Sequence, residues 1–298
     1  MIHLDRIATF LAVAAHGGFR EAAKHTGLSQ PAVTQHIKRL EQALKIELID
    51  RSNAGSTLTA AGRMFLPYAE SLMHTWDRAC GLFAKESIVV GASSNSGIYL
   101  LQPYLKAYRD TMQEKLDVVI GDNREIADKL ERCEIDVAVM EWWDDRPGFV
   151  AGIWRREELV LIVPPQHEWA TLPGISPDRL RGLSFLGGEP GTGTGRLLLQ
   201  CLGDVAHTIG VAMQLGSTEA VKHAVHAGLG MSLVMASAVE KEHRAGWLRA
   251  IPIDGKPLHK EIFVTRRADG FSDAATIRFV DFLGQAAMQD APATPPAG

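Results

Sequence analysis

Apolar side chains recur at helical spacing within residues 28–44 of this 298-residue chain. Separated by four, three and four positions, they form one stripe: Val33, Ile37, Leu40 and Leu44. Such a stripe predicts an amphipathic helix. Ser29 is suited to cap its start, because a hydroxyl there accepts a backbone N–H. Pro31 is tolerated in the first turn, where its missing N–H would have had no partner.

A shorter helix is predicted just upstream, over residues 19–25, and it ends at the Thr26-Gly27 turn. An amphipathic helix before it is marked by Leu4, Ile7, Leu11 and Ala14. Two helices joined by a tight glycine-containing turn predict a helix-turn-helix. In that motif the second helix lies in the major groove of DNA, with residues near its N-terminus at the bases.

The side chains on the face of the second helix that would meet DNA are short or polar. They are Ser29, Gln30, Pro31, Thr34, Gln35 and Lys38. Glutamine suits adenine, threonine suits a thymine methyl group, and lysine suits a phosphate or guanine. A solvated helix face would show the same spacing, so these residues alone leave both interpretations open.

Two short strand-like segments follow, at residues 47–50 and 57–59, and they favour the DNA-binding interpretation. They flank a polar turn, Arg51-Ser52-Asn53-Ala54-Gly55, which predicts the wing of a winged helix. Arg51 would then contact the minor groove or a phosphate.

Residues 4–69 resemble the winged helix-turn-helix of LysR-type transcriptional regulators. The motifs that carry the resemblance are F-L-A-V-A-A-H-G-G-F-R-E-A-A, L-S-Q-P-A-V-T-Q-H-I-K-R-L-E and L-T-A-A-G, in that order. The chain departs from the family pattern at Gly18, Thr34, Lys45 and Ile49. The resemblance implies a regulator, not an enzyme, that binds double-stranded promoter DNA. It also implies a homodimer that assembles to a tetramer, and RNA polymerase as a partner.

A long helix is predicted to begin after Thr59, a suitable cap, and to reach about residue 84. Its apolar seam consists of Leu66, Ala69, Met73, Trp76, Cys80 and Phe83. The seam would pack either on the helix's own domain or on the same helix of a second subunit. Because the resemblance implies a dimerising linker helix at this position, we favour the pairing of two subunits.

From residue 87 onward, short apolar strands alternate with helices, which predicts an α/β domain with a mainly parallel sheet. The strands are expected at residues 88–91, 118–120, 136–140, 159–163, 183–186, 213–215, 231–234 and 261–264. Two lobes are implied, and they resemble the LysR effector domain, itself similar to periplasmic solute-binding proteins. The expected divisions are residues 1–59 for DNA binding, 60–86 for the linker, 87–163 with 265–288 for lobe I, 164–264 for lobe II, and 289–298 for a disordered tail.

Three loops at the ends of predicted strands open helices, at residues 91–96, 189–196 and 216–219. Free N–H groups and the helix dipole favour anions at such positions. Glycine-rich loops alone are weak indicators, but the resemblance implies that the family's ligand cleft uses these loops. The effector residues expected on that basis are Ser93, Ser94, Asn95, Thr192, Thr194, Arg196 and Thr218. We expect a small-molecule effector such as a carboxylate, phosphate or sulfate.

Charge and composition agree with this organisation. Residues 1–63 carry eight Lys and Arg against five Asp and Glu, whereas the whole chain has a net charge of −4. The positive excess favours the first segment as the DNA binder. No apolar run is as long as a membrane span, and the start lacks the apolar core of a signal peptide. We therefore expect a cytoplasmic protein with no membrane partner.

Two other classes of protein are less consistent with the sequence. For an enzyme, the three cysteines and eleven histidines lack metal-ligand spacing, and no nucleophile–base pair or nucleotide loop stands out. We therefore expect neither a metal nor a cofactor. A solute-binding protein would not need the predicted DNA-binding segment, which argues against this class. The Trp142-Trp143 pair is expected to form a surface patch or a subunit contact rather than a ligand contact.

Overall fold

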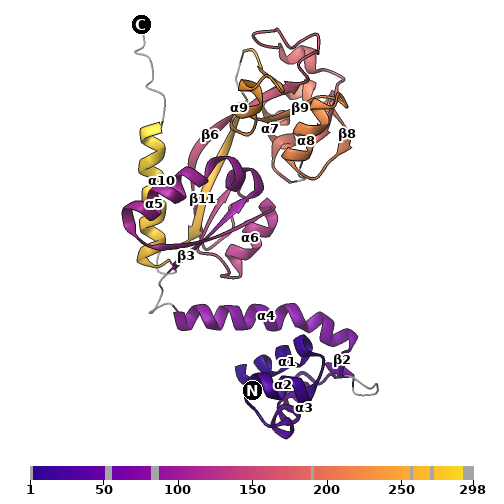
Figure 1. Cartoon of the computed structure of the whole chain (residues 1–298), viewed down its shortest axis with the longest axis vertical. Helices are drawn as coiled ribbons and strands as arrows, with labels where there is room; N and C mark the ends of the chain where they lie inside the picture. Colours follow the sequence, from indigo (N-terminus) through magenta and orange to yellow (C-terminus); the bar gives the residue numbers. More distant parts are fainter. Residues whose placement is uncertain are drawn as a thin grey trace. The chain divides into compact units, whose positions relative to one another are not determined.

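The computed structural model describes residues 3–50, 56–81, 87–188, 191–255, 258–268 and 272–290 (Figure 1). Contacts divide the chain into two compact units, one made mainly of residues 1–85 and the other mainly of residues 86–298. Each unit has a hydrophobic core of its own. The chain therefore passes from one unit to the other beside the predicted end of the linker helix.

The described part of the first unit begins with α1 (Leu4–His16), α2 (Phe19–Thr26) and α3 (Gln30–Leu44), followed by β1 (Ile49–Asp50) and β2 (Thr57–Leu58). Gly17 and Gly27 end α1 and α2 with φ angles of 70° and 68°, in the left-handed region that favours glycine. These turns produce the predicted helix-turn-helix. β1 and β2 pair antiparallel, as predicted at the base of a wing, but the wing turn and Arg51 lie outside the described residues.

Helix α3 has the cap and the buried stripe that its sequence predicts. The Ser29 Oγ accepts a hydrogen bond from the Ala32 N–H at 3.4 Å. The stripe residues Val33, Ile37 and Leu40 are fully buried against α1 and α2. The helix ends at Leu44 and is capped by Lys45, whose φ of 57° is left-handed, where the family resemblance would place glycine. A side chain in that conformation costs roughly 1–2 kcal/mol.

Helix α4 (Ala60–Gly81) begins at the predicted cap, where the Thr59 Oγ1 accepts a hydrogen bond from the Gly62 N–H at 2.9 Å. The first half of the predicted dimerisation seam packs into the core of the first unit instead: Leu66, Ala69 and Met73. Trp76 is exposed, and Phe83 lies outside the described residues. The prediction that this seam pairs two subunits is therefore wrong for its first half.

A neighbouring face of α4, which shares Trp76 with the predicted seam, is both apolar and exposed. It consists of Met64, Tyr68, Leu72 and Trp76, which are 74%, 68%, 47% and 49% exposed. These residues recur every four positions, so they lie along one side of the helix. We call them the exposed stripe of α4.

A seven-stranded sheet runs through the second unit in the order β10-β6-β11-β5-β3-β4, with β9 also paired to β6. The strands are β3 (Ser87–Ser93), β4 (Lys115–Gly121), β5 (Val137–Met140), β6 (Phe149–Val163), β9 (Ser232–Met235), β10 (Arg249–Pro252) and β11 (His259–Arg267). β3 pairs in parallel with β4 and β5, whereas β6 and β11 pair antiparallel with each of their neighbours. The prediction of a mainly parallel sheet is therefore wrong.

The long strands β6 and β11 connect two lobes (Figure 1). β6 pairs with β11 over residues 149–158, and from Leu159 it pairs with β9 and β10. Sequence patterning predicted only residues 159–163 of β6, because the first part carries charged side chains. The lobe limits at residues 163 and 264 stay a prediction, and the partner change of β6 comes earlier, at Leu159.

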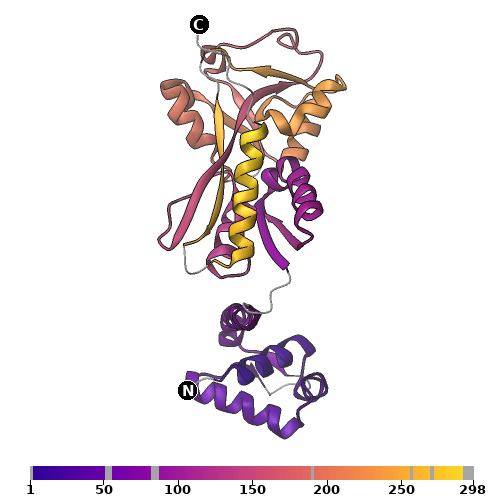
Figure 2. The same cartoon turned by 90° about the vertical axis from the view of Figure 1, so that its left-hand side faces the viewer.

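Helices cover the first lobe, which holds β3, β4 and β5. They are the π-helix η1 (Ser96–Leu100), α5 (Gln102–Met112), α6 (Asn123–Glu131) and α10 (Ala274–Asp290). Figure 2 shows α10 lying along the two long strands beside α5. Tyr108 of α5 packs edge-on against Phe279 and Phe282, with ring centroids 5.0 and 5.2 Å away. Because α10 reaches Asp290, the predicted tail begins too early, and residues 291–298 lie outside the described residues.

The second lobe combines β9, β10 and the end of β6 with a separate parallel pair of strands, β7 (Ser184–Gly187) and β8 (Gly210–Gln214). Its helices are η2 (Pro177–Leu180), α7 (Thr194–Leu202), η3 (Gly203–Thr208), α8 (Thr218–His226) and α9 (Ala236–Arg244). The Leu186 N–H donates to the Met231 carbonyl at 2.9 Å, which links the small sheet to the large one. In the part of the chain described here, no helix is long and apolar enough to cross a membrane.

Candidate functional site

The outer face of α3 forms a shallow groove from residues that the sequence predicts to meet DNA. The groove is lined by Gln30, Pro31, Thr34, Gln35 and Lys38. Gln35 and Lys38 are exposed, which leaves their polar ends accessible to a partner. The Thr34 hydroxyl donates to the Gln30 carbonyl at 3.0 Å, so this side chain is held against its own helix.

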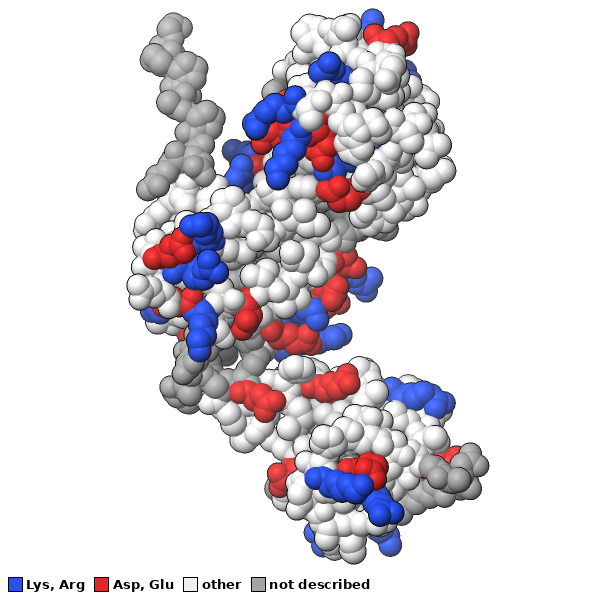
Figure 3. Space-filling model, in the orientation of Figure 1, with Lys and Arg blue, Asp and Glu red and all other residues white. Residues whose placement is uncertain are grey.

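Positive side chains gather on the same part of the first unit. Figure 3 shows Lys and Arg at its lower edge, where Figure 1 places α3. Lys38 and Arg39 of α3 are both exposed. The groove therefore combines amide side chains, which can read bases, with cations that attract phosphates.

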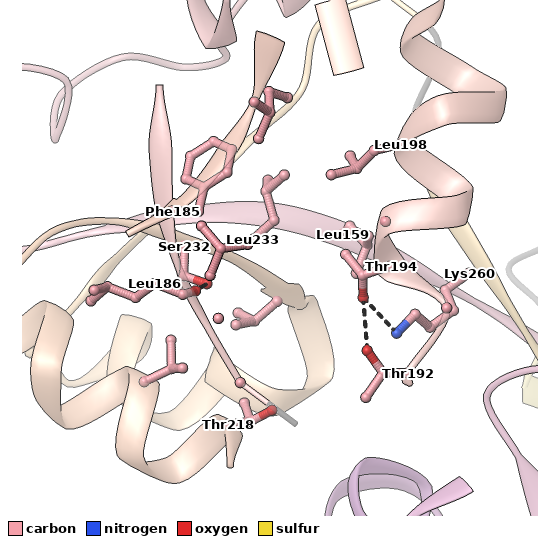
Figure 4. A pocket seen from close by; sticks show the side chains of 18 of the residues that line it. Leu159, Phe185, Leu186, Thr192, Thr194, Leu198, Thr218, Ser232, Leu233 and Lys260 are labelled. Carbon is pink, nitrogen blue, oxygen red and sulfur yellow. Dashed lines mark hydrogen bonds between the residues drawn. The ribbon is translucent and has the colours of Figure 1, made fainter. Parts of the chain in front are cut away.

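The second unit contains a cavity of about 430 Å³. Its lining includes four of the seven predicted effector residues: Asn95, Thr192, Thr194 and Thr218. Asn95 belongs to the first lobe and the three threonines to the second, so the cavity opens where the lobes meet. Figure 4 shows Thr192 and Thr194 beside Lys260, with Phe185 and Leu233 on another wall.

Three predicted effector residues do not line this cavity. The Ser93 hydroxyl is buried and donates to the Ser96 Oγ at 2.9 Å, and the Ser94 hydroxyl donates to the Gly121 carbonyl at 3.1 Å. The Arg196 guanidinium lies 5.2 Å from the ring centroid of Trp142. Their side chains are thus engaged by the protein, and their role toward an effector stays a prediction.

A buried ion pair that the sequence did not predict lies beside the cavity. The Lys260 Nζ is 2.6 Å from the Glu141 Oε2 and 3.0 Å from the Thr194 Oγ1. The side chains of Lys260 and Glu141 are 5% and 0% exposed. Glu141 directly follows a predicted strand, which was the available signal, whereas Lys260 carried none.

Asn95 connects this ion pair to the second lobe. Its Nδ2 donates to both carboxylate oxygens of Glu141, at 3.1 and 3.3 Å, and its Oδ1 accepts from the Thr218 hydroxyl at 2.7 Å. The chain of contacts therefore runs from Thr194 through Lys260, Glu141 and Asn95 to Thr218. It joins the N-termini of α7 and α8 through two side chains of the first lobe, Glu141 and Asn95.

A second contact between the lobes involves Tyr99 and helix α8. The Tyr99 hydroxyl donates to the Glu219 Oε1 at 2.7 Å. The buried Lys222 Nζ lies 2.7 Å from the same oxygen and 2.6 Å from the Glu242 Oε1. Burial raises the pKa of Glu219, but the hydrogen bonds from Lys222 and Tyr99 outweigh burial and hold that pKa below its ordinary value of 4.5.

The third contact between the lobes uses Trp142. Its Nε1 donates to the Gly191 carbonyl, and its ring packs on Gly193, where an added Cβ would lie 3.2 Å from the ring. Trp143 is 9% exposed and belongs to the core beside α6. The prediction that this tryptophan pair forms a surface patch is therefore wrong, since one ring packs on the second lobe and the other is buried.

Acid is expected to weaken the contact between Tyr99 and Glu219. A carboxylate with a lowered pKa stabilises the fold above the ordinary pKa of 4.5, and this contribution is lost as the pH falls below 4.5 through the lowered value. Urea unfolding from pH 6 to pH 3 should therefore show a steeper loss of stability in the wild type than in Glu219→Gln. Glu240→Gln, which alters an exposed ion pair on α9, is the matched control. Equal slopes for wild type and Glu219→Gln would contradict the expectation.

Comparison with known proteins identifies both units. Residues 4–63 match the family model of the bacterial regulatory helix-turn-helix protein of the LysR family, and residues 84–288 match the LysR substrate binding domain. The chain is 41% identical over 190 residues to a protein of Stutzerimonas stutzeri named "Putative HTH-type transcriptional regulator protein PtxE", covering 63% of this chain and 97% of that protein.

Two further similarities extend over almost the whole chain. A protein of Cyanidioschyzon merolae named "Probable RuBisCO transcriptional regulator" is 29% identical, with 93% of this chain and 95% of that protein covered. The crystal structure of CbnR, a LysR family transcriptional regulator, shares the fold with a TM-score of 0.72 at 20% identity, covering 96% of this chain and 99% of CbnR. The chain thus belongs to the LysR family of transcriptional regulators, with a DNA-binding helix-turn-helix followed by a two-lobed effector domain.

Proposed function

We propose that this regulator changes its affinity for promoter DNA when a small anionic metabolite binds between the lobes of its effector domain. One observation carries the proposal: the cavity is lined from both lobes, and it lies beside the chain of contacts from Thr194 to Thr218. A ligand there touches groups whose spacing depends on how the lobes are arranged. Binding one arrangement better than another would shift the balance between them.

Three features support an anion. The N-termini of α7 and α8 open beside the cavity, and the free N–H groups of helix N-termini favour negative charge. Lys260 also lines the cavity, with its ammonium group paired to Glu141. An ammonium group has three N–H donors, and among the described residues Glu141 and Thr194 accept two of them. The third donor suits a carboxylate, phosphate or sulfate oxygen.

The coupling to DNA need not be large to regulate a promoter. Allosteric couplings of about 1–3 kcal/mol change affinity by about 5- to 150-fold. Either lobe arrangement could favour DNA, so the same coupling would serve activation or repression. Contact with RNA polymerase is the expected route to activation.

Replacing Gln35 with alanine is expected to relax base preference on DNA. A bidentate amide contact to a base discriminates by about 1–3 kcal/mol, so the ratio of specific to non-specific affinity should fall about 5- to 150-fold. Lys38→Ala, on the same face, should instead weaken binding to all sequences alike and reduce its salt dependence. Fluorescence anisotropy with a fragment from the regulator's own upstream region and with scrambled DNA measures both effects. An unchanged specificity ratio in Gln35→Ala would remove Gln35 from the reading face.

We further propose that the exposed stripe of α4 pairs two subunits. Four large apolar side chains along one helix side are unfavourable in water, and an apolar patch of this kind marks an interface. Pairing of two chains would set two α3 helices against two half-sites of DNA. A tetramer would then form from two such dimers.

A further inference from the structure

The cavity of the effector domain extends well beyond its polar side. Past the threonines and Lys260, its wall is formed by side chains of β7, β8, β9, α7 and η3 and by Ile209, which precedes β8. We call this part the apolar chamber, and its principal residues are Phe185, Leu198, Ala206, Ile209, Val211 and Leu233. Phe185 and Leu198 are 6% and 8% exposed, so the chamber enters the second lobe.

The polar groups near the chamber are occupied by the protein. The Ser232 hydroxyl donates to the Leu186 carbonyl at 2.6 Å, and the Gln214 amide donates to the Gly188 carbonyl. Both residues line the cavity, yet their donors are directed to backbone oxygens. His207 is another polar residue that lines the cavity, and its side chain is exposed to solvent. The wall of the chamber therefore offers contact area rather than hydrogen bonds.

We propose that the effector is an amphiphilic acid, with one anionic head at Lys260 and the threonines and an apolar body in the chamber. This inference rests on the proposed function, because it describes the ligand of the same cavity. Small-molecule pockets commonly measure about 300–1,000 Å³ and combine an apolar lining with few polar groups. The cavity of about 430 Å³ fits that description, with Thr192, Thr194 and Lys260 together on one side.

A small inorganic anion fits this cavity poorly. Phosphate or sulfate would use the polar side and leave Phe185, Leu198 and Leu233 facing water. Burying those surfaces against a hydrocarbon group is favourable by the hydrophobic effect. The chamber thus favours a carboxylate that carries an aliphatic or aromatic body over free phosphate or sulfate.

A series of acids tests the inference on the full-length protein. Acetate, butyrate and hexanoate share one head and differ in apolar length, and titration calorimetry would compare them with inorganic phosphate and sulfate. Each methylene buried in the chamber is expected to raise affinity about fourfold, so hexanoate should bind over 100-fold more tightly than acetate. Equal affinities along the series, or tighter binding of phosphate or sulfate than of hexanoate, would overturn the inference.

The second measurement repeats the acid series on a variant whose apolar chamber is filled by a larger side chain. Ala206→Phe places a large ring in the chamber and is expected to abolish the gain in affinity from chain length. Gln200→Phe adds the same ring at an exposed position of α7 that does not line the cavity, and it should behave like the wild type. Thermal melting of both variants verifies that they are folded. An undiminished chain-length gain in folded Ala206→Phe would contradict the assignment of the chamber.

Failure of this inference can be distinguished from failure of the proposed function. Hexan-1-ol lacks the anionic head, so binding as tight as that of hexanoate would support the chamber but reject the anionic site. DNA affinity unchanged by every bound acid would reject the metabolite control, whatever the chain-length trend. A flat chain-length trend with DNA affinity that responds to phosphate would reject only the amphiphilic ligand.

Discussion

Lys260→Met is expected to destabilise the effector domain by about 3–5 kcal/mol, because removing one partner of a buried ion pair leaves an uncompensated charge. Glu141 would keep its hydrogen bonds from Asn95 but lose the cation 2.6 Å away. Methionine has about the length of the lysine stem, so the packing changes little. For a domain of this size, a loss of 3–5 kcal/mol corresponds to a fall in melting temperature of roughly 6–20 °C.

Calorimetric melting of the full chain measures this change, and two further variants identify its cause. Adding Glu141→Gln to Lys260→Met removes the buried charge but keeps an amide in its place, so most of the lost stability should return. Lys241→Met removes a charge at an exposed position of α9 and should shift the melting temperature by less than about 2 °C. If the double variant melted no higher than Lys260→Met, loss of packing rather than the unpaired carboxylate would explain the effect.

The second large effect is expected from Leu72→Asp in the exposed stripe of α4. If two copies of the stripe pack together, each dimer buries two copies of Leu72. Burying a leucine contributes about 1.5–3 kcal/mol, so losing both should weaken the dimer by more than about 100-fold. Sedimentation equilibrium would detect the dissociation, and DNA with two half-sites should then be bound no more tightly than DNA with one.

His74→Asp is the matched control for this prediction. It introduces the same carboxylate at an exposed position of α4 that lies off the stripe. It should leave the oligomeric state unchanged, and circular dichroism should show equal helix content in both variants. A Leu72→Asp protein that stayed dimeric at micromolar concentration would exclude the stripe as the subunit interface.

The helix-turn-helix could be predicted from sequence because its determinants are local. A cap at Ser29, a stripe of apolar residues and two glycine turns each act within a few positions. The linker helix was predicted as an element for the same reason. Its packing face was not, because α4 carries two apolar stripes, and periodicity does not say which of them faces the domain core.

The sheet was harder to predict because its long strands depend on distant partners. The first part of β6 contains Arg155, Arg156 and Glu157, which do not resemble a buried strand. The Arg155 guanidinium donates to the Tyr104 hydroxyl of α5 at 3.0 Å, and Arg156 reaches Glu261 of β11 at 2.9 Å. These charges are accommodated by neighbours that only the fold supplies.

The residues of the candidate site also divide into those that local sequence indicates and those that depend on distant partners. Thr192, Thr194 and Thr218 could be predicted because they lie in loops that open helices, a signal within the local sequence. Lys260 could not be predicted, because Glu141 lies 119 positions away in the chain. Ser93 looked available in the sequence, but its hydroxyl is buried beside Ser96. Local patterns thus locate the rim of the cavity, whereas its charge depends on tertiary packing.

The passage of β6 and β11 through both lobes limits how the lobes can move. A hydrogen-bonded ribbon resists stretching and shearing far more than it resists twisting. Opposite Ile262 and Phe263, β6 carries one extra residue, Trp154, and this bulge gives β6 a place of greater twist. We therefore expect the two lobes to move by twisting of the β6–β11 pair rather than by hinge closure. A ligand would change the angle between the lobes by winding or unwinding this ribbon, with little change in their separation.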